Sequence, residues 1–345
     1  MRAVKSQSGI RIEMPERFSE QYNSTLDCRF YGSDNLYPYH LHDLYETSPT
    51  LQGCVNRLRD FLIGSGSTGK FIDHKTFQML MQDYALYGGF ALYVSSNGLG
   101  QIVGVRYVPF ESIRLGEQGA DGRYTYCYYS ADWAQIKTVN KKRVNARDAE
   151  RYFMFCDDEP TRARRFNETG KGEVLYFSNT MSYPSESARA CINYISTEVG
   201  VSNLVYRDTR CSFMNSSVLA IPRQSDDDSN EFIENLEMLQ GDTNSFKILT
   251  IEYSSLEDKP ELIDLAGKDY TDRILRLSED ARQHIIRAFG QEAFIRLSEG
   301  GLGFGSETIS EIYKFYNRQV APMRDAALAY LRRVDPVFQS DPLVY

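Results

Sequence analysis

Two long amphipathic helices joined by a glycine-rich segment constrain the fold of this chain more than any other feature, and they are predicted within residues 269–331. In both helices apolar residues recur at steps of three and four, which places one apolar stripe along each helix. The stripes comprise Ile274, Leu277, Ala281, Ile285 and Ala288 in the first helix, and Ile309, Ile312, Tyr316, Val320, Met323 and Ala327 in the second. The sequence LSEGGLGFGS at 297–306 separates them. Because glycine readily adopts φ > 0, a flexible loop is predicted between two rigid helices.

The region before this pair predicts helices mixed with antiparallel strands. One helix is predicted from Ser48-Pro49, where a capping serine precedes a proline at the first helical position, and another from Asp73. Runs at 90–94 and 102–108 flank an Asn-Gly pair, which is a strong hairpin signal. More strands are predicted at 112–115, 123–129, 151–156 and 173–177. An α+β fold is therefore expected up to about residue 180.

Three further segments complete the expected organisation. Residues 157–172 alternate acids with arginines and predict a solvated loop. A long helix is predicted over 184–213, followed by a small α/β insertion with strands at 218–221 and 246–253. The tail after Arg333 contains two prolines and is expected to fray.

Composition limits the classes of protein to consider. The 345 residues exceed the roughly 250–300 at which one core usually stops growing, so two or more substructures are expected. No apolar run approaches the ~20 residues of a membrane helix, and a polar segment follows Met1, so a soluble protein without a signal peptide is expected. The net charge of −8 argues against a protein that grips nucleic acid. Six dispersed cysteines indicate neither a zinc site nor a disulfide scaffold.

One motif resembles a nucleotide-binding loop. The sequence GSGSTGK at 64–70 is similar to a Walker A loop, in which backbone N–H groups surround phosphates. However, Phe71 stands where that loop has Ser or Thr, and the motif follows a predicted helix, not a strand. A plain linker between helices is the preferred interpretation, and nucleotide binding is the alternative.

Other candidate chemistry is weaker still. Asp226, Asp227 and Asp228 could attract a divalent ion, but three adjacent carboxylates do not alternate as metal-loop ligands do. The four histidines have no Ser or Cys at a catalytic spacing. The sequence therefore predicts no enzyme, no metal site and no cofactor.

Several segments, in this order, resemble the portal proteins of tailed bacteriophages over about residues 30–333. They are YGSDNLYP at 31–38 before the Ser48-Pro49 helix, DYALYGGFALY at 83–93, GDTNSFKIL at 241–249, IIRAF at 285–289 and QVAP at 319–322. The resemblance implies a portal-like α+β fold with an antiparallel α/β wing, long stem helices and a small α/β clip insertion. Because the chain stops near residue 345, a large crown is expected to be missing or reduced.

The resemblance also implies a division of the chain. This division is an N-terminal arm at 1–30, the wing at 31–183, a stem helix at 184–215, the clip at 216–267, a second stem helix at 268–290, a tunnel loop at 291–306, and a helix near the wing and crown with a C-terminal tail at 307–345.

The implied function is structural: a ring, in this family dodecameric, at one capsid vertex, through which the genome is packaged and ejected. Its implied partners are other copies of the chain, non-specific double-stranded DNA, terminase, the major capsid protein and a head–tail adaptor, with no membrane. The protein would reside in the virion, and in the bacterial host cytoplasm during assembly. A capsid or head–tail adaptor protein without DNA contact is a further alternative.

The resemblance places candidate sites in two segments. The tunnel loop would bring Arg296, Glu299, Gly300, Gly301, Gly303 and Gly305 to the DNA channel. The clip would present Arg223, Asp226, Asp227 and Asp228 to terminase or adaptor.

Overall fold

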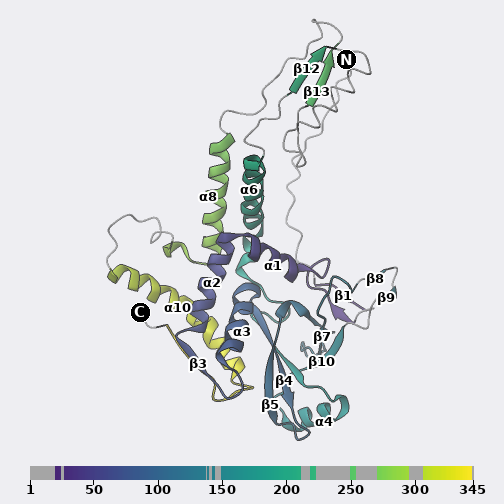
Figure 1. Ribbon diagram of the computed structural model, residues 1–345. Coiled ribbons are helices and arrows are strands. Elements are labelled where there is room, and N and C mark those ends of the chain that lie inside the picture. Colours follow the sequence, from purple (N-terminus) through teal and green to yellow (C-terminus); the bar gives the residue numbers. More distant parts are fainter. Residues whose placement is uncertain are drawn as a thin grey trace. The chain divides into compact units, whose positions relative to one another are not determined.

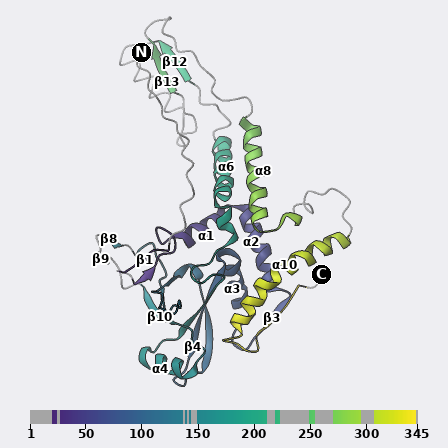
Figure 2. The same ribbon diagram turned by 180° about the vertical axis from the view of Figure 1, so that it is seen from behind.

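The computed structural model describes residues 20–24, 27–136, 138–139, 142–143, 149–210, 218–222, 249–253, 270–294 and 306–343. The chain divides into two compact units, Met1–Ala190 with Ile286–Tyr345, and Cys191–Ile285. Figures 1 and 2 show the elements of both units from opposite sides. The mixture of helices and sheets confirms the α+β class.

A six-stranded sheet organises the larger unit, in the order β5-β4-β11-β10-β7-β6. Its strands are β4 (Gly89–Ser96), β5 (Ile102–Val108), β6 (Ile113–Leu115), β7 (Tyr126–Tyr129), β10 (Glu150–Met154) and β11 (Glu173–Ser178). Neighbouring strands are antiparallel except for β10 and β11, which are parallel. The predicted strands are therefore confirmed in place, whereas the parallel pair was not predicted.

The prediction of a solvated loop over 157–172 is wrong, because α4 (Glu159–Thr169) lies there. The Asp158 side chain accepts from the Thr161 amide at 2.9 Å, and Gly170 ends the helix with φ +67°. A parallel pair needs a crossover connection, which α4 provides between β10 and β11. The buried Arg162 donates to the carbonyl oxygens of Gly100 and Cys156 at 2.9 and 2.8 Å. These contacts, not an apolar stripe, hold the polar helix against the sheet.

The predicted capped helices are confirmed. Ser48 begins α2 (Pro49–Ile63) by accepting from the Leu51 amide at 3.1 Å, and Asp73 begins α3 (His74–Tyr87) by accepting from the Thr76 amide at 3.0 Å. The hairpin of β4 and β5 is also confirmed, although its connection covers residues 97–101 instead of two residues. The described part of this unit also contains α1 (Tyr37–Thr47), α5 (Ser187–Ala190), α10 (Ser306–Leu331) and a short 3₁₀ helix, η1 (Phe110–Ser112). Short strand pairs form from β1 (Tyr22–Asn23) with β2 (Cys28–Arg29) and from β8 (Thr138–Val139) with β9 (Lys142–Arg143).

Helices α3 and α10 pack on the same strand of the sheet. The ring of Tyr84 on α3 meets that of Phe177 on β11 edge to face, with 5.2 Å between centroids. Tyr330 on α10 approaches Phe177 at the same centroid distance. Since both contacts fall on one residue of β11, the two helices share the core on that face.

The expectation that the tail frays after Arg333 is wrong. Strand β14 (Gln339–Asp341) pairs antiparallel with β3 (Gly66–Thr68), and the Phe338 side chain is fully buried. Gly64, which follows α2, has φ +76°, and a Cβ there would lie 1.9 Å from the Asp341 carbonyl oxygen. This close approach requires glycine, and it joins the end of the chain to the segment after α2.

The smaller unit contains α6 (Ile192–Arg210), β12 (Val218–Pro222), β13 (Leu249–Tyr253) and most of α8 (Tyr270–Ala288). The rings of Tyr194 on α6 and His284 on α8 stack with 4.1 Å between centroids, so the two helices lie side by side (Figure 1). The single helix predicted over 184–213 is divided at Cys191 into α5 and α6. Strands β12 and β13 pair with each other in parallel over five residues.

Candidate functional site

The residues that the sequence proposed for function lie outside the described part of the chain. This applies to Arg223, Asp226, Asp227 and Asp228 of the clip, and to Arg296, Glu299, Gly300, Gly301, Gly303 and Gly305 of the tunnel loop. Their roles therefore stay predictions. The described residues do include both ends of the segment predicted as a tunnel loop, at 291–294 and from Ser306 onward.

Gln291, where the predicted tunnel loop was placed to begin, is fully buried, and residues 292–294 form a helical turn. The Gln291 Nε2 donates to the Cys54 carbonyl oxygen at 2.9 Å and to the Tyr316 hydroxyl at 2.8 Å. Its Oε1 accepts from Arg57 Nη1 at 2.8 Å. One amide thus connects α2, the segment after α8, and α10.

An aromatic cluster reinforces this connection. The Phe294 ring meets those of Tyr313 and Tyr316 at 5.3 Å each, both near perpendicular. Phe61 on α2 approaches all three rings, at 4.8 to 6.2 Å. The guanidinium of Arg57 lies 4.6 Å from the Phe294 centroid. The helical turn before residues 295–305 and helix α10 after them are therefore both packed against α2. The contacts between described residues that hold them there involve none of the residues 295–305.

The sequence at 64–70 does not adopt the phosphate-binding geometry that its glycines suggest. Residues 66–68 form strand β3, and the Phe71 and Ile72 amides donate to Asp335 Oδ2 at 2.7 and 3.2 Å. The Lys70 ammonium lies 4.7 Å from the Phe71 ring centroid. Because the centre of the motif pairs as a strand and the two amides after it bind a carboxylate of the chain, this geometry argues against the nucleotide-binding alternative.

The described residues provide no group of three or more His, Cys, Asp or Glu side chains placed to hold a metal ion. Three histidines contact ordinary polar partners: His40 with Asp34 at 2.9 Å, His74 with Ser67 at 2.9 Å, and His284 with Asp280 at 3.6 Å. In the same described part of the chain, no helix is both long and apolar enough to cross a membrane.

Arg114 and Asp83 are among the charged residues that are buried near the sheet. Arg114 is fully buried; it donates to Asn35 Oδ1 and to the Asn35 carbonyl oxygen, both at 2.6 Å, and it lies 5.0 Å from the Trp133 ring centroid. Asp83 on α3 accepts from the Tyr107 hydroxyl at 2.9 Å and the Phe110 amide at 3.1 Å. Burial raises the pKa of Asp83 to about 8, against the effect of these two hydrogen bonds. Arg114 thus joins the segment before α1 to β6, and Asp83 joins α3 to β5 and to the residues after it.

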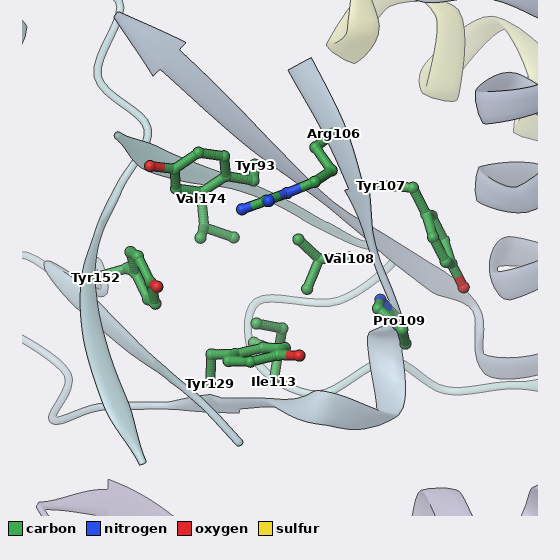
Figure 3. A pocket seen from close by; sticks show the side chains of 9 residues that line it. All are labelled: Tyr93, Arg106, Tyr107, Val108, Pro109, Ile113, Tyr129, Tyr152 and Val174. Carbon is green, nitrogen blue, oxygen red and sulfur yellow. The ribbon is translucent and has the colours of Figure 1, made fainter. Parts of the chain in front are cut away.

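A hollow of about 320 Å³ opens on the sheet between β5, β7 and β10 (Figure 3). The Arg106 guanidinium extends into it and lies 5.1 Å from the Tyr93 centroid, while the rings of Tyr93 and Tyr152 meet edge to face at 5.8 Å. Val174 lies between the two rings, and Tyr129 lies on the opposite side. A hollow lined by aromatic rings and one cation is suited to binding a side chain or a ligand. It is not suited to covalent catalysis, because its nine lining residues contain no nucleophile beside a base.

Sequence reasoning did not single out Gln291, Asp335, Asp83 or Arg106. The partners of the first three lie 24 to 264 positions away along the chain, and so no local pattern marks them. Arg106 is the one charged residue of an otherwise uncharged strand, IVGVRYV. This single charge in an otherwise uncharged strand could have identified Arg106 as a candidate from the sequence.

Comparison with known proteins gives the fold alone. The chain matches no protein-family model and none of the curated proteins. Among solved structures, a chain in the neck of an empty gene transfer agent (GTA) particle, computed with C6 symmetry, aligns with TM-score 0.51 and 13% identity over 89% of this chain and 85% of that one. A chain in the neck of the native particle, computed with C12 symmetry, aligns with TM-score 0.50 and 13% identity over 88% and 84%. A third, in the virion of the native particle, gives TM-score 0.49 and 13% identity over 88% and 83%. The chain therefore has a fold similar to that of GTA neck chains.

Proposed function

We propose that this chain is the subunit of a portal ring, the structural component through which a phage-like particle packages and releases DNA. One observation carries the proposal: the fold matches neck chains of a GTA particle over 88–89% of its length. Those necks were computed with C6 and C12 symmetry, which is compatible with a homo-oligomeric ring of twelve copies of this chain.

The proposal assigns a role to each part. The six-stranded sheet and its helices would be the wing, α6 and α8 the stem, and residues 216–267 the clip that meets terminase or a head–tail adaptor. Within the described residues, β12 and β13 pair only with each other, so both outer edges of this pair could take strands of neighbouring clips. The clip residues Arg223 and Asp226–Asp228 would contribute to this contact.

Residues 295–305 are proposed to line the channel, with Arg296 and Glu299 near passing phosphates. The buried Gln291 and the aromatic cluster on α2 support this role, because they hold the two ends of the segment on a rigid base. The chain's net charge of −8 is consistent with a conduit in which DNA moves without adhering. No enzymatic step belongs to this proposal.

Deletion of the gene in a particle-producing host tests the proposal against the adaptor alternative. A portal is needed before DNA enters the head, so its loss should leave heads without DNA. An adaptor acts after filling, so its loss should leave heads that fill and then leak. DNA-filled heads in the deletion strain would overturn the portal proposal.

A further inference from the structure

The hollow beside Arg106 lies on the face of the sheet opposite to α3 and α10. Arg106 on β5 pairs with Tyr93 on β4, and Tyr93 pairs with Val174 on β11, so these three side chains point to one face (Figure 3). Phe177, which both helices contact, is three positions after Val174 on the same strand and therefore points to the other face. The hollow is thus separate from the core that the two helices share.

The lining of the hollow is mostly apolar and aromatic. Its volume of about 320 Å³ is near the lower end of the range for ligand pockets, roughly 300–1,000 Å³. The rings of Tyr93 and Tyr152 meet edge to face at 5.8 Å, and buried side chains complete the apolar lining, namely Val108, Ile113 and Val174. Such a lining favours a small ligand with a flat apolar group.

The Arg106 guanidinium determines the charge that a ligand can carry. Tyrosine rings alone attract cations, but this guanidinium already lies 5.1 Å from the Tyr93 centroid and repels a second positive charge. Among the described residues, no carboxylate forms an ion pair with Arg106. In contrast, Lys171, which lies 4.9 Å from the Tyr152 centroid, is paired with Glu150 at 3.0 Å. Arg106 is therefore available to an anion.

A single guanidinium favours a carboxylate over a phosphate. A carboxylate carries one negative charge and accepts two parallel hydrogen bonds from a guanidinium. A phosphate monoester carries about −1.5 to −2 charges at neutral pH. Among the nine described residues that line the hollow, Arg106 is the one cation, and it balances the charge of a carboxylate alone.

We propose that this hollow binds a carboxylate attached to one flat apolar group, with Arg106 holding the carboxylate and the rings of Tyr93 and Tyr152 packing against the apolar group. A free aromatic acid and the C-terminal aromatic residue of a peptide share this chemistry. The site goes beyond the proposed portal role and does not depend on it, because every lining residue belongs to one chain.

Saturation-transfer NMR of the full-length protein with small probes at millimolar concentration tests the chemistry of the site. Phenylacetate should bind at least about tenfold more tightly than the neutral phenylacetamide, because its carboxylate gains charge-assisted hydrogen bonds. Benzylamine, which is a cation at neutral pH, and phenyl phosphate should both bind more weakly than phenylacetate. Equal binding of phenylacetate and phenylacetamide, or tighter binding of benzylamine or phenyl phosphate, would overturn the proposal.

Two variants locate the bound acid. Arg106→Gln removes the guanidinium of an exposed residue and should weaken phenylacetate binding at least about tenfold, with unchanged thermal unfolding. Arg123→Gln changes another exposed arginine, which does not line the hollow, and should leave the affinity as in the wild type. An unaltered affinity of Arg106→Gln for phenylacetate would overturn the assignment.

A peptide probe, N-acetyl-glycyl-phenylalanine, distinguishes the two sources of the acid. Tighter binding of the peptide than of phenylacetate assigns the site to the terminal residue of a partner protein, whereas equal or weaker binding of the peptide assigns it to a free acid. Either result supports the site, provided that Arg106→Gln weakens binding of the preferred probe. Binding of neither probe at millimolar concentration would contradict the proposal.

Discussion

Replacing Asp83 with asparagine should change the pH dependence of stability in a defined way. Asp83 is 6% exposed, and burial raises its pKa from 3.8 to about 8, with Glu111 adding to the effect. In the native state the carboxyl is neutral at pH 7, whereas in the unfolded chain it is ionised. A carboxyl whose pKa is raised on folding favours the native state fully below pH 3.8, and this contribution is lost as pH rises towards 8. Each pH unit within that window costs about 1.4 kcal/mol.

The free energy of unfolding of the wild type should therefore fall by about 3 kcal/mol relative to Asp83→Asn between pH 5 and 7. Asparagine keeps an oxygen that can accept from Tyr107 and the Phe110 amide, so the packing is preserved. The chain has one tryptophan, Trp133, which is buried in the larger unit. Its fluorescence during urea unfolding at pH 5, 6, 7 and 8 reports on that unit alone. A wild-type-to-variant difference that stays constant over this range would show that Asp83 has the same charge in both states, and would refute the reasoning.

Three further predictions concern the anchor of the proposed channel segment, the carboxylate that holds the end of the chain, and the glycines of the channel segment. Gln291→Met removes a buried amide with three partners and should destabilise the larger unit by about 2–4 kcal/mol. The control Glu292→Gln, at the exposed neighbour, should change the free energy of unfolding by under about 0.5 kcal/mol. Equal effects of the two variants in urea unfolding would refute the anchoring role of Gln291. Asp335→Ala leaves two amides without their acceptor and should cost about 2 kcal/mol, with faster hydrogen exchange in β14; unchanged exchange would show that the carboxylate does not hold the chain end. Replacing the four glycines of residues 300–305 with alanine should give particles with normal capsids and reduced DNA content, because alanine restricts the backbone φ angles and hinders rearrangement of the segment. A normal DNA content, measured by quantitative PCR, would exclude a conduit role for the segment.

Local signals made part of this fold predictable. Ser48 and Asp73 mark helix starts through side chains that bind amides three residues away, and the Asn-Gly pair between two strand-like runs predicts the hairpin of β4 and β5. Asp158 and Gly170 mark the two ends of helix α4. The helix was nevertheless missed, because it has no apolar stripe and its buried arginine contacts a carbonyl 62 positions earlier. The order of the C-terminal tail was missed for the same reason, since Asp335 binds amides more than 260 positions away.

The candidate site, like the fold, was predictable only where local sequence signals determine its structure. The pair of long helices around residues 295–305 follows from the periodic apolar stripes, and α8 and α10 confirm both helices. The buried amide of Gln291 could not be predicted, because its three partners belong to α2 and α10 and become neighbours only in the folded chain. The channel and clip residues lie outside the described part, so their roles stay predictions.

The mass of the purified full-length protein under native conditions tests the central proposal most directly. Twelve copies of the 39.6 kDa chain would weigh about 475 kDa, and native mass spectrometry combined with electron microscopy of the same sample should show a closed ring with an open centre. The account predicts such rings at micromolar protein or above. A species that stays monomeric at every concentration and salt condition, with no rings in the images, would contradict it.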